Sequence, residues 1–312
     1  MSDIAQAIAA LRRGELVGMP TETVYGLAAD ARNPAAIARI FALKGRPAEH
    51  PVIVHLSDAE HMRAWAKDIP AHAWQLAKQF WPGPMTLILN KLSGVLDQIT
   101  GGQDSVGLRV PNHPIALALL AEFDDGLAAP SANRFGHISP TTAQHVRDEF
   151  GTQLELILDG GAAQVGIEST IIDARTPELR ILRPGAITEA QIAHLRDPQF
   201  TGTHAAAPAL NTPRVSGALK SHYAPRTCTT LHSRAEIEAW TGAGATLVLS
   251  IAALPARHDG IALSANPAEY ASTLYAALRA LDARGAEQIL IERPPQTAAW
   301  AAIWDRISRA CA

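Results

Sequence analysis

The chain has 312 residues, a formal net charge of −3 and 47% hydrophobic residues. Its length allows two domains, each large enough to bury a core of its own. No apolar run approaches the roughly 20 residues that a membrane-spanning helix needs. The weakly negative charge excludes a global electrostatic attraction to nucleic acid, so any RNA contact would have to be local.

The cysteines and the N-terminus indicate the compartment. Cys228 and Cys311 are the only cysteines, which argues against a disulfide framework and against a structural zinc site. Residues 2–14 predict a capped amphipathic helix and lack the basic start and long apolar stretch of a signal peptide. We therefore expect a cytoplasmic protein without a membrane partner.

Helical and strand-like patterns alternate closely from the N-terminus to about residue 199, and this part is expected to form one domain (1–199). We expect strands at Leu16–Met19, Val52–Leu56, Met85–Leu89, Val106–Val110, Leu127–Ala129, Leu154–Leu158, Thr170–Asp173 and Arg180–Leu182. We expect helices at Asp3–Arg13, Pro34–Leu43, Glu60–Lys67, Ala71–Phe80, Pro114–Glu122, Thr141–Phe150 and Glu189–Leu195. The alternation predicts an α/β fold, and the short strands with polar turns favour a twisted, mixed sheet with flanking helices.

Residues 200–226 have the composition of a linker, with three prolines and no Asp or Glu. Loops of this length are often functional, so we expect this basic, aromatic-bearing segment to fold over an anionic ligand as a lid. A smaller domain, 227–312, is expected to follow. Strands are expected there at Thr229–His232, Thr246–Ile251, Gly260–Leu263 and Gln288–Ile291, and helices at Arg234–Trp240, Pro267–Ala283 and Thr297–Ala310. This pattern predicts a three-layer, Rossmann-like α/β domain.

Two adjacent turns carry the polar groups that first suggest a function. Pro20–Gly26 (Pro-Thr-Glu-Thr-Val-Tyr-Gly) follows the first strand, and Lys44-Gly45-Arg46-Pro47 follows a helix that Asn33 is expected to cap. Two cations on either side of one glycine suit a phosphate, because glycine lets the backbone approach. Taken alone, the second turn is more often a helix C-cap with solvated charges.

Four further clusters follow in the same expected domain. They are Ser105–Pro111, with Arg109 inside a strand; Ala129–Asn133, followed by Ser139-Pro140-Thr141; Gly166–Thr170; and Leu182–Gly185. Each alone is explained by a turn or a surface salt bridge. In this order, together with the two turns, they resemble the L-threonylcarbamoyladenylate synthases, the YrdC-type family, in the longer form with an additional C-terminal domain. The resemblance covers residues of about 5–195, and His222-Tyr223-Ala224-Pro225 extends it into the linker.

The resemblance implies a nucleotidyltransferase that makes an adenylate from L-threonine, bicarbonate and ATP and releases pyrophosphate. This would be the first step of a tRNA modification beside the anticodon, with a downstream tRNA threonylcarbamoyl-transfer complex as partner. A direct, weak tRNA contact is left open. Because the carbamate of threonine is already an anion, the main requirement is to bring two anions together, which calls for cations and Mg²⁺ bound with ATP. No tightly bound, protein-ligated metal is expected.

The matching motif positions imply roles for individual residues. Lys44 and Arg46 would be catalytic and hold the ATP phosphates, as solvated charges on a turn. L-threonine would be held by Thr23, His55, Arg109, the backbone near Ala129 and Ser169, with Arg109 as partner of its carboxylate. The nucleotide would also contact His50, Ser105, Ser131, Asn133, Ser139, Arg183 and Tyr223. His50 stands where the family usually has asparagine, and the linker departs from the family pattern but retains Tyr223.

Two alternatives remain open at this point. A double-stranded RNA-binding or ribosome-assembly module without catalysis would use a concave basic surface of the same fold. The net negative charge and the lack of basic runs with interleaved aromatics argue against it. Carbamoyl transfer to a protein thiol would need zinc-finger and acylphosphatase-like modules, for which the sequence shows no signal. The chain also lacks a Walker motif, so ATP binding would depend on the clusters above.

Overall fold

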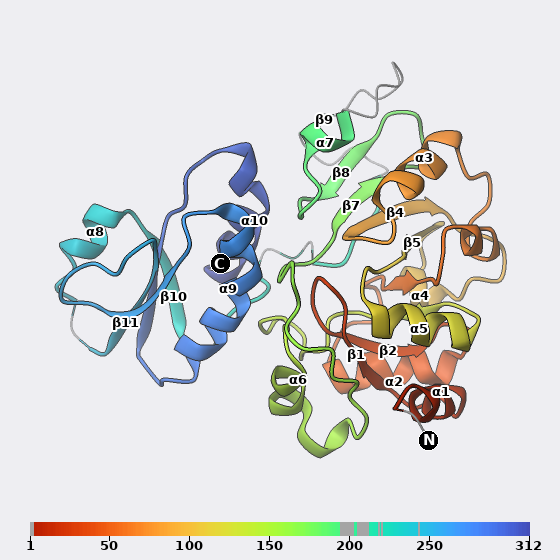
Figure 1. The fold of residues 1–312 in the computed structure, drawn as a ribbon, viewed down its shortest axis with the longest axis horizontal. Coiled ribbons are helices and arrows are strands. Elements are labelled where there is room, and N and C mark those ends of the chain that lie inside the picture. The colour runs from red at the N-terminus through yellow and green to blue at the C-terminus, as the bar shows by residue number, and fades with distance from the viewer. Residues whose placement is uncertain (1–2, 194–202, 205–211, 218, 220, 243) are drawn as a thin grey trace.

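The computed structural model describes residues 3–193, 203–204, 212–217, 219, 221–242 and 244–312. These residues form two sheets, each with its own helices (Figure 1). Within this part of the chain, no helix is both long and apolar enough to cross a membrane.

The first sheet is mixed, as predicted. Its strands lie in the order β1-β2-β6-β3-β5-β4-β7-β8-β9. The pairs β3–β5, β4–β7 and β8–β9 are parallel and the others are antiparallel. The strands are β1 (Val17–Met19), β2 (Gly26–Asp30), β3 (Ile53–His55), β4 (Met85–Asn90), β5 (Ser105–Arg109), β6 (Leu127–Ala128), β7 (Thr170–Asp173), β8 (Arg180–Arg183) and β9 (Thr203–His204).

Helices cover both faces of this sheet. On one face, α2 and α3 bury Ile37, Ile40 and Leu76 in the largest core cluster. On the opposite face, α1 and α5 bury Leu11 and Leu119 with the β1 and β6 strands. The helices are α1 (Asp3–Arg12), α2 (Pro34–Lys44), α3 (Ala71–Phe80), α4 (Asp97–Thr100), α5 (Pro114–Phe123), α6 (Ala143–Phe150) and α7 (Glu189–Ala193), with 3-10 turns η1 (Glu60–Ala64) and η2 (Gly151–Gln153).

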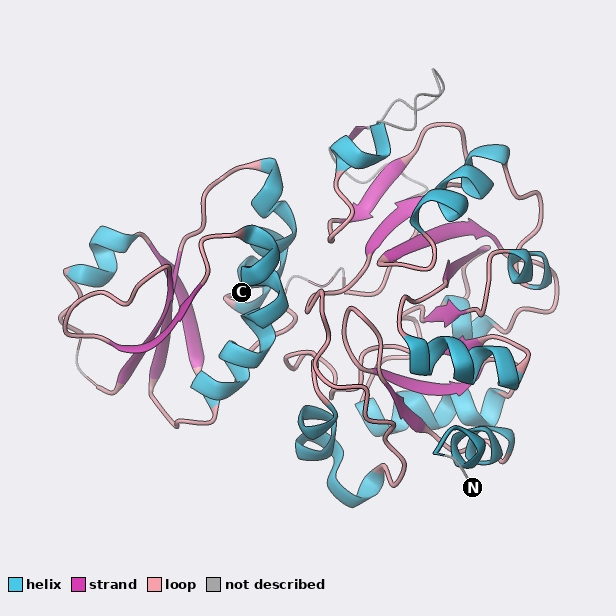
Figure 2. Ribbon diagram, viewed as in Figure 1, coloured by secondary structure: helices cyan, strands magenta, loops and turns pink. Residues whose placement is uncertain are grey.

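The second sheet is fully parallel and forms the predicted three-layer unit (Figure 2). Its order is β10-β13-β11-β12. Side chains alternate across it: Leu247 and Leu249 pack with α9 and α10, whereas Val248 packs with Ile237 of α8. The elements are β10 (Cys228–His232), α8 (Arg234–Glu238), β11 (Thr246–Ile251), β12 (Asp259–Leu263), α9 (Pro267–Asp282), β13 (Gln288–Glu292), η3 (Ala298–Trp300) and α10 (Ala301–Ala310). Helices α9 and α10 lie on the side that faces the first sheet (Figure 1).

Within the described residues the strand prediction differs from the structure at β2, at Leu154–Leu158 and at β9. The prediction missed β2, because Gly-Leu-Ala-Ala-Asp lacks the β-branched and aromatic residues typical of strands. Residues Leu154–Leu158 do not form a strand; Ile157 makes only an isolated parallel bridge with Gly18. The Ile157 side chain lies directly over Gly18, where a Cβ atom would come within 2.9 Å of it. The contact is therefore a local approach over one glycine and does not extend into a ladder.

The helix prediction differs mainly at ends and in short turns. The segment Glu60–Lys67 narrows to the 3-10 turn η1, and Thr297–Ala310 divides into η3 and α10. The prediction missed α4, a single turn too short to show a periodic pattern. The predicted end of the helix at Leu195, and most of 200–211, lie outside the described residues. Strand β9 falls inside the segment expected to be a linker.

Candidate active site

Two parallel strands end in the side chains expected to bind the amino acid. His55 is the last residue of β3 and Arg109 the last of β5, and the two are register partners. They therefore project from the same edge of the sheet, the usual position of ligand groups in α/β folds. Arg109 Nε donates to the carbonyl of Gly83 at 3.2 Å, and Arg109 Nη2 lies 2.7 Å from Glu22 Oε1.

The turn between β1 and β2 is closed by its own hydroxyls. Thr21 Oγ1 donates to the carbonyl of Val24 at 2.6 Å and accepts the backbone N–H groups of Thr23 and Val24. Such a side-chain turn fixes a short loop without regular structure. It holds Thr23 fully buried at the wall of the site.

The Lys-Gly-Arg turn is a helix C-cap whose two cations point inward. Gly45 has φ 63° and ends α2, with its N–H bonded to the carbonyl of Ala42 and the N–H of Arg46 bonded to that of Phe41. Lys44 and Arg46 are only 3% and 7% exposed. The expectation that both are solvated was therefore wrong, because the cap directs them under the loops that follow β6 and α2.

Both cations are held by backbone carbonyls. Lys44 Nζ donates to the carbonyls of Ser131 and Asn133, each at 2.5 Å. Arg46 Nη2 donates to the carbonyl of Pro51 at 2.7 Å and reaches Ser216 Oγ at 3.4 Å. Burial, with the nearby Arg46, holds the pKa of Lys44 well below its usual range. Burial lowers the pKa of Arg46 to about 10, so it remains charged at neutral pH.

Arg183 forms hydrogen bonds both beside the first sheet and with the linker. Arg183 ends β8, and its Nε and Nη2 donate to the carbonyl of Ser169 at 3.1 and 2.9 Å. Its Nη1 donates to the carbonyl of Ser216 at 2.9 Å. Ser169 Oγ in turn shares a hydrogen bond of 2.7 Å with Thr86 of β4. The guanidinium thereby lies between the strand edge and the segment expected to act as a lid.

Tyr223 and His222 form the opposite wall, and both are buried. Tyr223 has φ 61°, a conformation that is unfavourable for a bulky side chain and is typical of functional sites. Its hydroxyl packs against Gly217, where a Cβ atom would collide with it. Among the described residues, neither the Tyr223 hydroxyl nor His222 Nδ1 has a hydrogen-bond partner.

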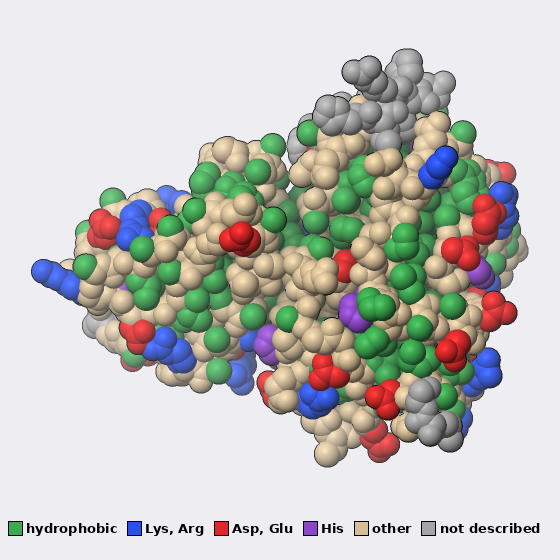
Figure 3. Space-filling view, viewed as in Figure 1, with side chains coloured by type: hydrophobic (Ala, Val, Ile, Leu, Met, Phe, Trp, Pro, Cys, Tyr) green, Lys and Arg blue, Asp and Glu red, His purple; other side chains and the backbone are tan. Residues whose placement is uncertain are grey.

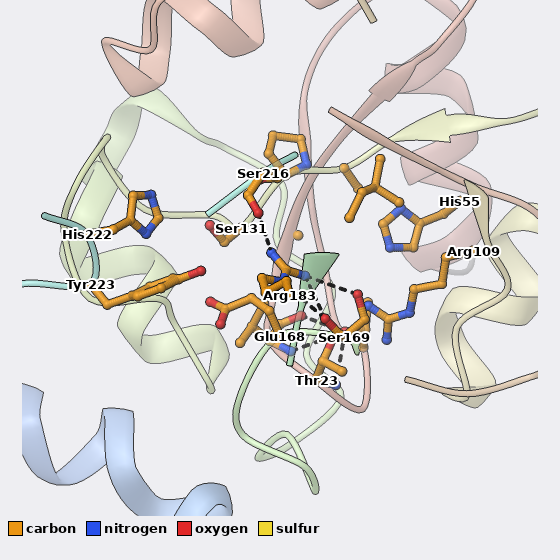
Figure 4. A pocket seen from close by; sticks show the side chains of 16 residues that line it. Thr23, His55, Arg109, Ser131, Glu168, Ser169, Arg183, Ser216, His222 and Tyr223 are labelled. Carbon is orange, nitrogen blue, oxygen red and sulfur yellow. Dashed lines mark hydrogen bonds between the residues drawn. The ribbon is translucent and has the colours of Figure 1, made fainter. Parts of the chain in front are cut away.

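These groups meet in one pocket with a cavity of about 40 Å³. Figure 4 shows His55 and Arg109 on one side, His222 and Tyr223 on the other, and Glu168, Ser169 and Arg183 between them. Predicted site residues that line the pocket are Thr23, His55, Arg109, Ala129, Ser131, Ser169, Arg183 and Tyr223. The structure therefore brings together the residues predicted for threonine and part of those predicted for ATP.

Other predicted residues lie just outside the pocket lining. Lys44 and Arg46 reach it through Ser131 and Ser216, and Ser139 Oγ donates to the lining residue Glu168 at 2.6 Å. Ser105 lines a smaller adjacent cavity that also contacts Ser216. Asn133 is not part of the pocket lining, and its Nδ2 donates to the carbonyls of Arg134 and His137. His50 packs edge-on against Phe135, with ring centroids 5.3 Å apart.

The two histidines of the pocket are neutral. Burial, followed by the charge of Arg109, lowers the pKa of His55 to about 3. Burial also lowers the pKa of His222 to about 3, although Glu168 acts in the opposite direction. Among the described residues His55 Nδ1 has no hydrogen-bond partner. At neutral pH both imidazoles can offer hydrogen bonds to a substrate but no positive charge.

The sequence prediction assigned no role to Glu168, although it stands in one of the motifs. Its Oε1 accepts from Ser139, and its Oε2 accepts from Tyr275 at 2.9 Å and from Arg306 at 2.7 Å. Tyr275 and Arg306 come from α9 and α10 of the second unit. Their contribution carries no local sequence signal, because the partners lie more than 100 positions away in the chain.

The pocket does not fit a resident metal ion. Both oxygens of Glu168 are occupied by donors, and Glu22 is paired with Arg109. Within the described ranges, no group of three or more His, Cys, Asp or Glu side chains could hold a metal.

Known families match both units of the chain. Residues 9–185 match the Sua5/YciO/YrdC family, which carries the description telomere recombination. Residues 187–312 match the family described as the C-terminal domain of threonylcarbamoyl-AMP synthase. The chain belongs to the Sua5/YciO/YrdC family.

Individual relatives agree with this membership. The threonylcarbamoyl-AMP synthase of Pyrococcus abyssi is 44% identical over 220 residues, which are 69% of this chain and 63% of the relative. The enzyme of that name from Bacillus subtilis is 45% identical over 190 residues, 61% of this chain and 55% of the relative. The matched region thus spans less than two thirds of each of these relatives.

A solved structure extends the likeness over both units. The structure of P. abyssi Sua5 complexed with L-threonine superposes with a TM-score of 0.92 at 36% identity. The match covers 100% of this chain and 95% of that one. The fold class predicted from the sequence, a YrdC-like mixed sheet followed by a smaller α/β unit, is confirmed.

Proposed function

We propose that this chain is an L-threonylcarbamoyladenylate synthase, a nucleotidyltransferase that converts L-threonine, bicarbonate and ATP into threonylcarbamoyl-AMP and pyrophosphate. The observation that carries the proposal is that one pocket joins the two predicted substrate sides. His55 and Arg109 line one side of it, His222 and Tyr223 line the other, and Arg183 lies between them. The relatives named threonylcarbamoyl-AMP synthase and the threonine complex of P. abyssi Sua5 support the same activity.

On the threonine side, Arg109 would bind the substrate carboxylate through its guanidinium. His55 is neutral, so it would orient threonine by hydrogen bonding and would not act as a cationic anchor. The Thr23 hydroxyl, which is within 2.9 Å of Thr21 Oγ1, would contact the polar end of the amino acid. Ser169 and the backbone of Ala129 complete this proposed subsite.

The chemistry begins when the amine of threonine combines with bicarbonate, losing water and forming a carbamate. A carbamate oxygen then attacks the α-phosphorus of ATP, and the bond to the pyrophosphate leaving group breaks. The carbamate is already an anion, so the step requires charge stabilisation more than a strong base. We assign that role to Arg183, Arg46 and Lys44, which lie in or beside the pocket without a carboxylate within salt-bridge distance in the described structure.

ATP binding would require the linker to move. The cavity of about 40 Å³ has room for a few water molecules and not for a nucleotide. Ser216, His222 and Tyr223 fill the space on the nucleotide side. We therefore propose that Ser216, His222 and Tyr223, which belong to the described part of the predicted lid, withdraw to admit ATP and close again over it. Closure would protect an intermediate that water can hydrolyse.

We further propose that the chain is divided into a catalytic domain at 1–199, a linker at 200–226 and a C-terminal domain at 227–312. We also propose a cytoplasmic location, Mg²⁺ bound with ATP, and a downstream tRNA threonylcarbamoyl-transfer complex as partner. For the RNA-binding alternative no supporting feature is seen on the face shown in Figure 3, where acidic and basic side chains are interspersed.

Pyrophosphate release tests the function. The purified protein would be incubated with ATP and Mg²⁺, omitting L-threonine or bicarbonate in turn. We expect release only when both are present. Release without threonine would retain an ATP-using enzyme and refute the assigned substrate, and no release from folded protein would refute the synthase.

A further inference from the structure

The second unit places two side chains directly on a carboxylate of the pocket. From α10, Arg306 Nε donates to Glu168 Oε2 at 2.7 Å, and from α9 the Tyr275 hydroxyl donates to the same oxygen at 2.9 Å. Arg306 also donates to the backbone carbonyls of Glu168 and Pro184, at 3.2 and 3.0 Å. Arg306 and Tyr275 are both fully buried. A buried arginine that makes this many contacts to the wall of the pocket fixes its geometry.

The same two side chains hold Tyr223. The ring of Tyr275 stacks on that of Tyr223, with centroids 5.6 Å apart and an interplanar angle of 28°. The guanidinium carbon of Arg306 lies 5.4 Å from the Tyr223 ring centroid. One turn further along α10, the Arg309 side chain donates to the carbonyl of Leu219, and its backbone carbonyl accepts the N–H of His222. Helix α10 therefore supports both the pocket carboxylate and the linker aromatic.

The charge of Glu168 matters because it lies among the cations proposed to bind phosphate. Glu168 lies beside Arg183 in the pocket (Figure 4). Burial alone would raise the pKa of Glu168, but Arg306 and Arg183, with hydrogen bonds from Ser139 and Arg306, lower it to about 2. Without Arg306, the carboxylate would be left to pair with Arg183, the group proposed to hold ATP. Arg306 thus keeps the cations of the pocket available.

We propose that Arg306 is a positioning residue of the nucleotide site. Through it, the second unit balances the negative charge of Glu168, orients that carboxylate, and holds the Tyr223 ring in place. This inference depends on the proposed function, because it concerns the ATP side of the same pocket. It gives the C-terminal unit a specific role, since without that unit Glu168 would lose its hydrogen bonds from Arg306 and Tyr275, and Tyr223 would lose its stacking partner.

The test uses the full-length protein and a double-mutant cycle of Arg306→Met and Glu168→Gln. ATP affinity is measured by calorimetry, and the KM values for ATP and for threonine are measured separately by pyrophosphate release. For Arg306→Met we expect the ATP Kd and KM to rise at least about tenfold, with the threonine KM changed less than about threefold. Adding Glu168→Gln should recover most of the ATP loss, because the uncompensated charge is gone.

A matched control comes from the same interface. Arg279 of α9 also bridges the units, donating to the carbonyl of Ile138 and to Glu149 at 3.1 Å, away from the pocket lining. Arg279→Met should lower the melting temperature and leave the ATP KM unchanged. If Arg306→Met proves unstable, Tyr275→Phe removes one hydrogen bond to Glu168 and should raise the ATP KM about two- to fivefold.

The inference fails if Arg306→Met and Tyr275→Phe leave the ATP Kd unchanged. It also fails if Glu168→Gln gives no recovery, or if Arg279→Met changes the ATP KM as much as Arg306→Met does. A wild-type protein that releases no pyrophosphate would refute the proposed function instead. In that case the ATP Kd values alone decide whether Arg306 supports a nucleotide site.

Discussion

Glu22 and Arg109 form an ion pair of 2.7 Å in which both side chains are only 5% exposed. The carboxylate oxygens of Glu22 receive no aligned hydrogen bond from the described residues. The guanidinium proposed to bind the threonine carboxylate is therefore already paired with a carboxylate of the protein. A substrate carboxylate bound as proposed would share Arg109 with Glu22, so the effect of Arg109 on stability can be separated from its proposed effect on binding.

Arg109→Leu should cost about 3–5 kcal/mol of unfolding free energy, because it leaves the buried charge of Glu22 without a partner. Adding Glu22→Gln should restore most of that stability while threonine binding remains lost. Urea denaturation and threonine calorimetry on both variants check this. Recovery of threonine binding in the double variant would show that Arg109 does not bind the substrate.

Lys44→Ala should reduce pyrophosphate release at least about 100-fold and leave the protein folded. Because Lys44 is buried, its removal affects both charge and hydrogen bonding inside the protein. The substitution removes a desolvated charge but leaves the carbonyls of Ser131 and Asn133 without their donor, so the net change should stay within about 2 kcal/mol. Activity is compared with unfolding free energy from urea titration. A variant that unfolds would assign Lys44 a structural role.

Tyr223→Phe should weaken ATP binding without destabilising the protein. The hydroxyl has no hydrogen-bond partner among the described residues, so its removal should change the unfolding free energy by less than about 0.5 kcal/mol. We expect a rise of about three- to tenfold in the ATP KM and an unchanged threonine KM. Equal changes in both constants would argue against a lid on the nucleotide side.

Stability should fall with acidification before the carboxylates titrate. His55 and His222 have pKa values of about 3 in the folded protein, against about 6.5 when unfolded. Between these values the unfolded state binds more protons than the folded state. The contribution of the two histidines to the unfolding free energy is therefore fully present above about pH 7 and is lost progressively as the pH falls below about 6.5. Each histidine contributes a slope that approaches about 1.4 kcal/mol per pH unit.

The range from pH 6.5 to 5 separates these histidines from Glu149 and Glu168. The pKa of each carboxyl group is lowered to about 2, so their contributions begin to be lost only near the unfolded value of about 4.3. Urea titrations at pH 7, 6 and 5 measure how steeply the unfolding free energy changes with pH. His222→Gln should reduce that slope by about 1.4 kcal/mol per pH unit, the contribution of one proton. An unfolding free energy that stays constant over this range would contradict the buried, neutral imidazoles.

Much of the fold was predictable because local signals were strong. Asn33 and Pro34 begin α2 as expected, and the Asn33 side chain accepts the N–H groups of Ala35 and Ala36. The apolar run of β4 is buried on both faces, with Met85, Leu87 and Leu89 in the largest core cluster and Ile88 in another. The short β2, with its small residues, is a strand because β1 and β6 pair with it on either side and not because of its own composition.

The site was predictable only where its residues stand in motifs. His55, Arg109, Ser169 and Arg183 lie at or beside strand ends, and the structure places them in one pocket. The inward direction of Lys44 and Arg46 depends on the cap at Gly45 and on loops that close over them. The contacts of Arg306 and Tyr275 arise from docking of the second unit, which no sequence pattern encodes.

The identity of the product distinguishes the proposed synthase from other ATP-using enzymes. The protein would be incubated with ATP, Mg²⁺, L-threonine and carbon-13 bicarbonate. The adenylates would then be separated and their masses determined by mass spectrometry. We expect threonylcarbamoyl-AMP carrying a single labelled carbon, formed in equal amount with pyrophosphate. Threonine joined directly to AMP without the label, or ADP and phosphate as the products, would contradict the proposed function.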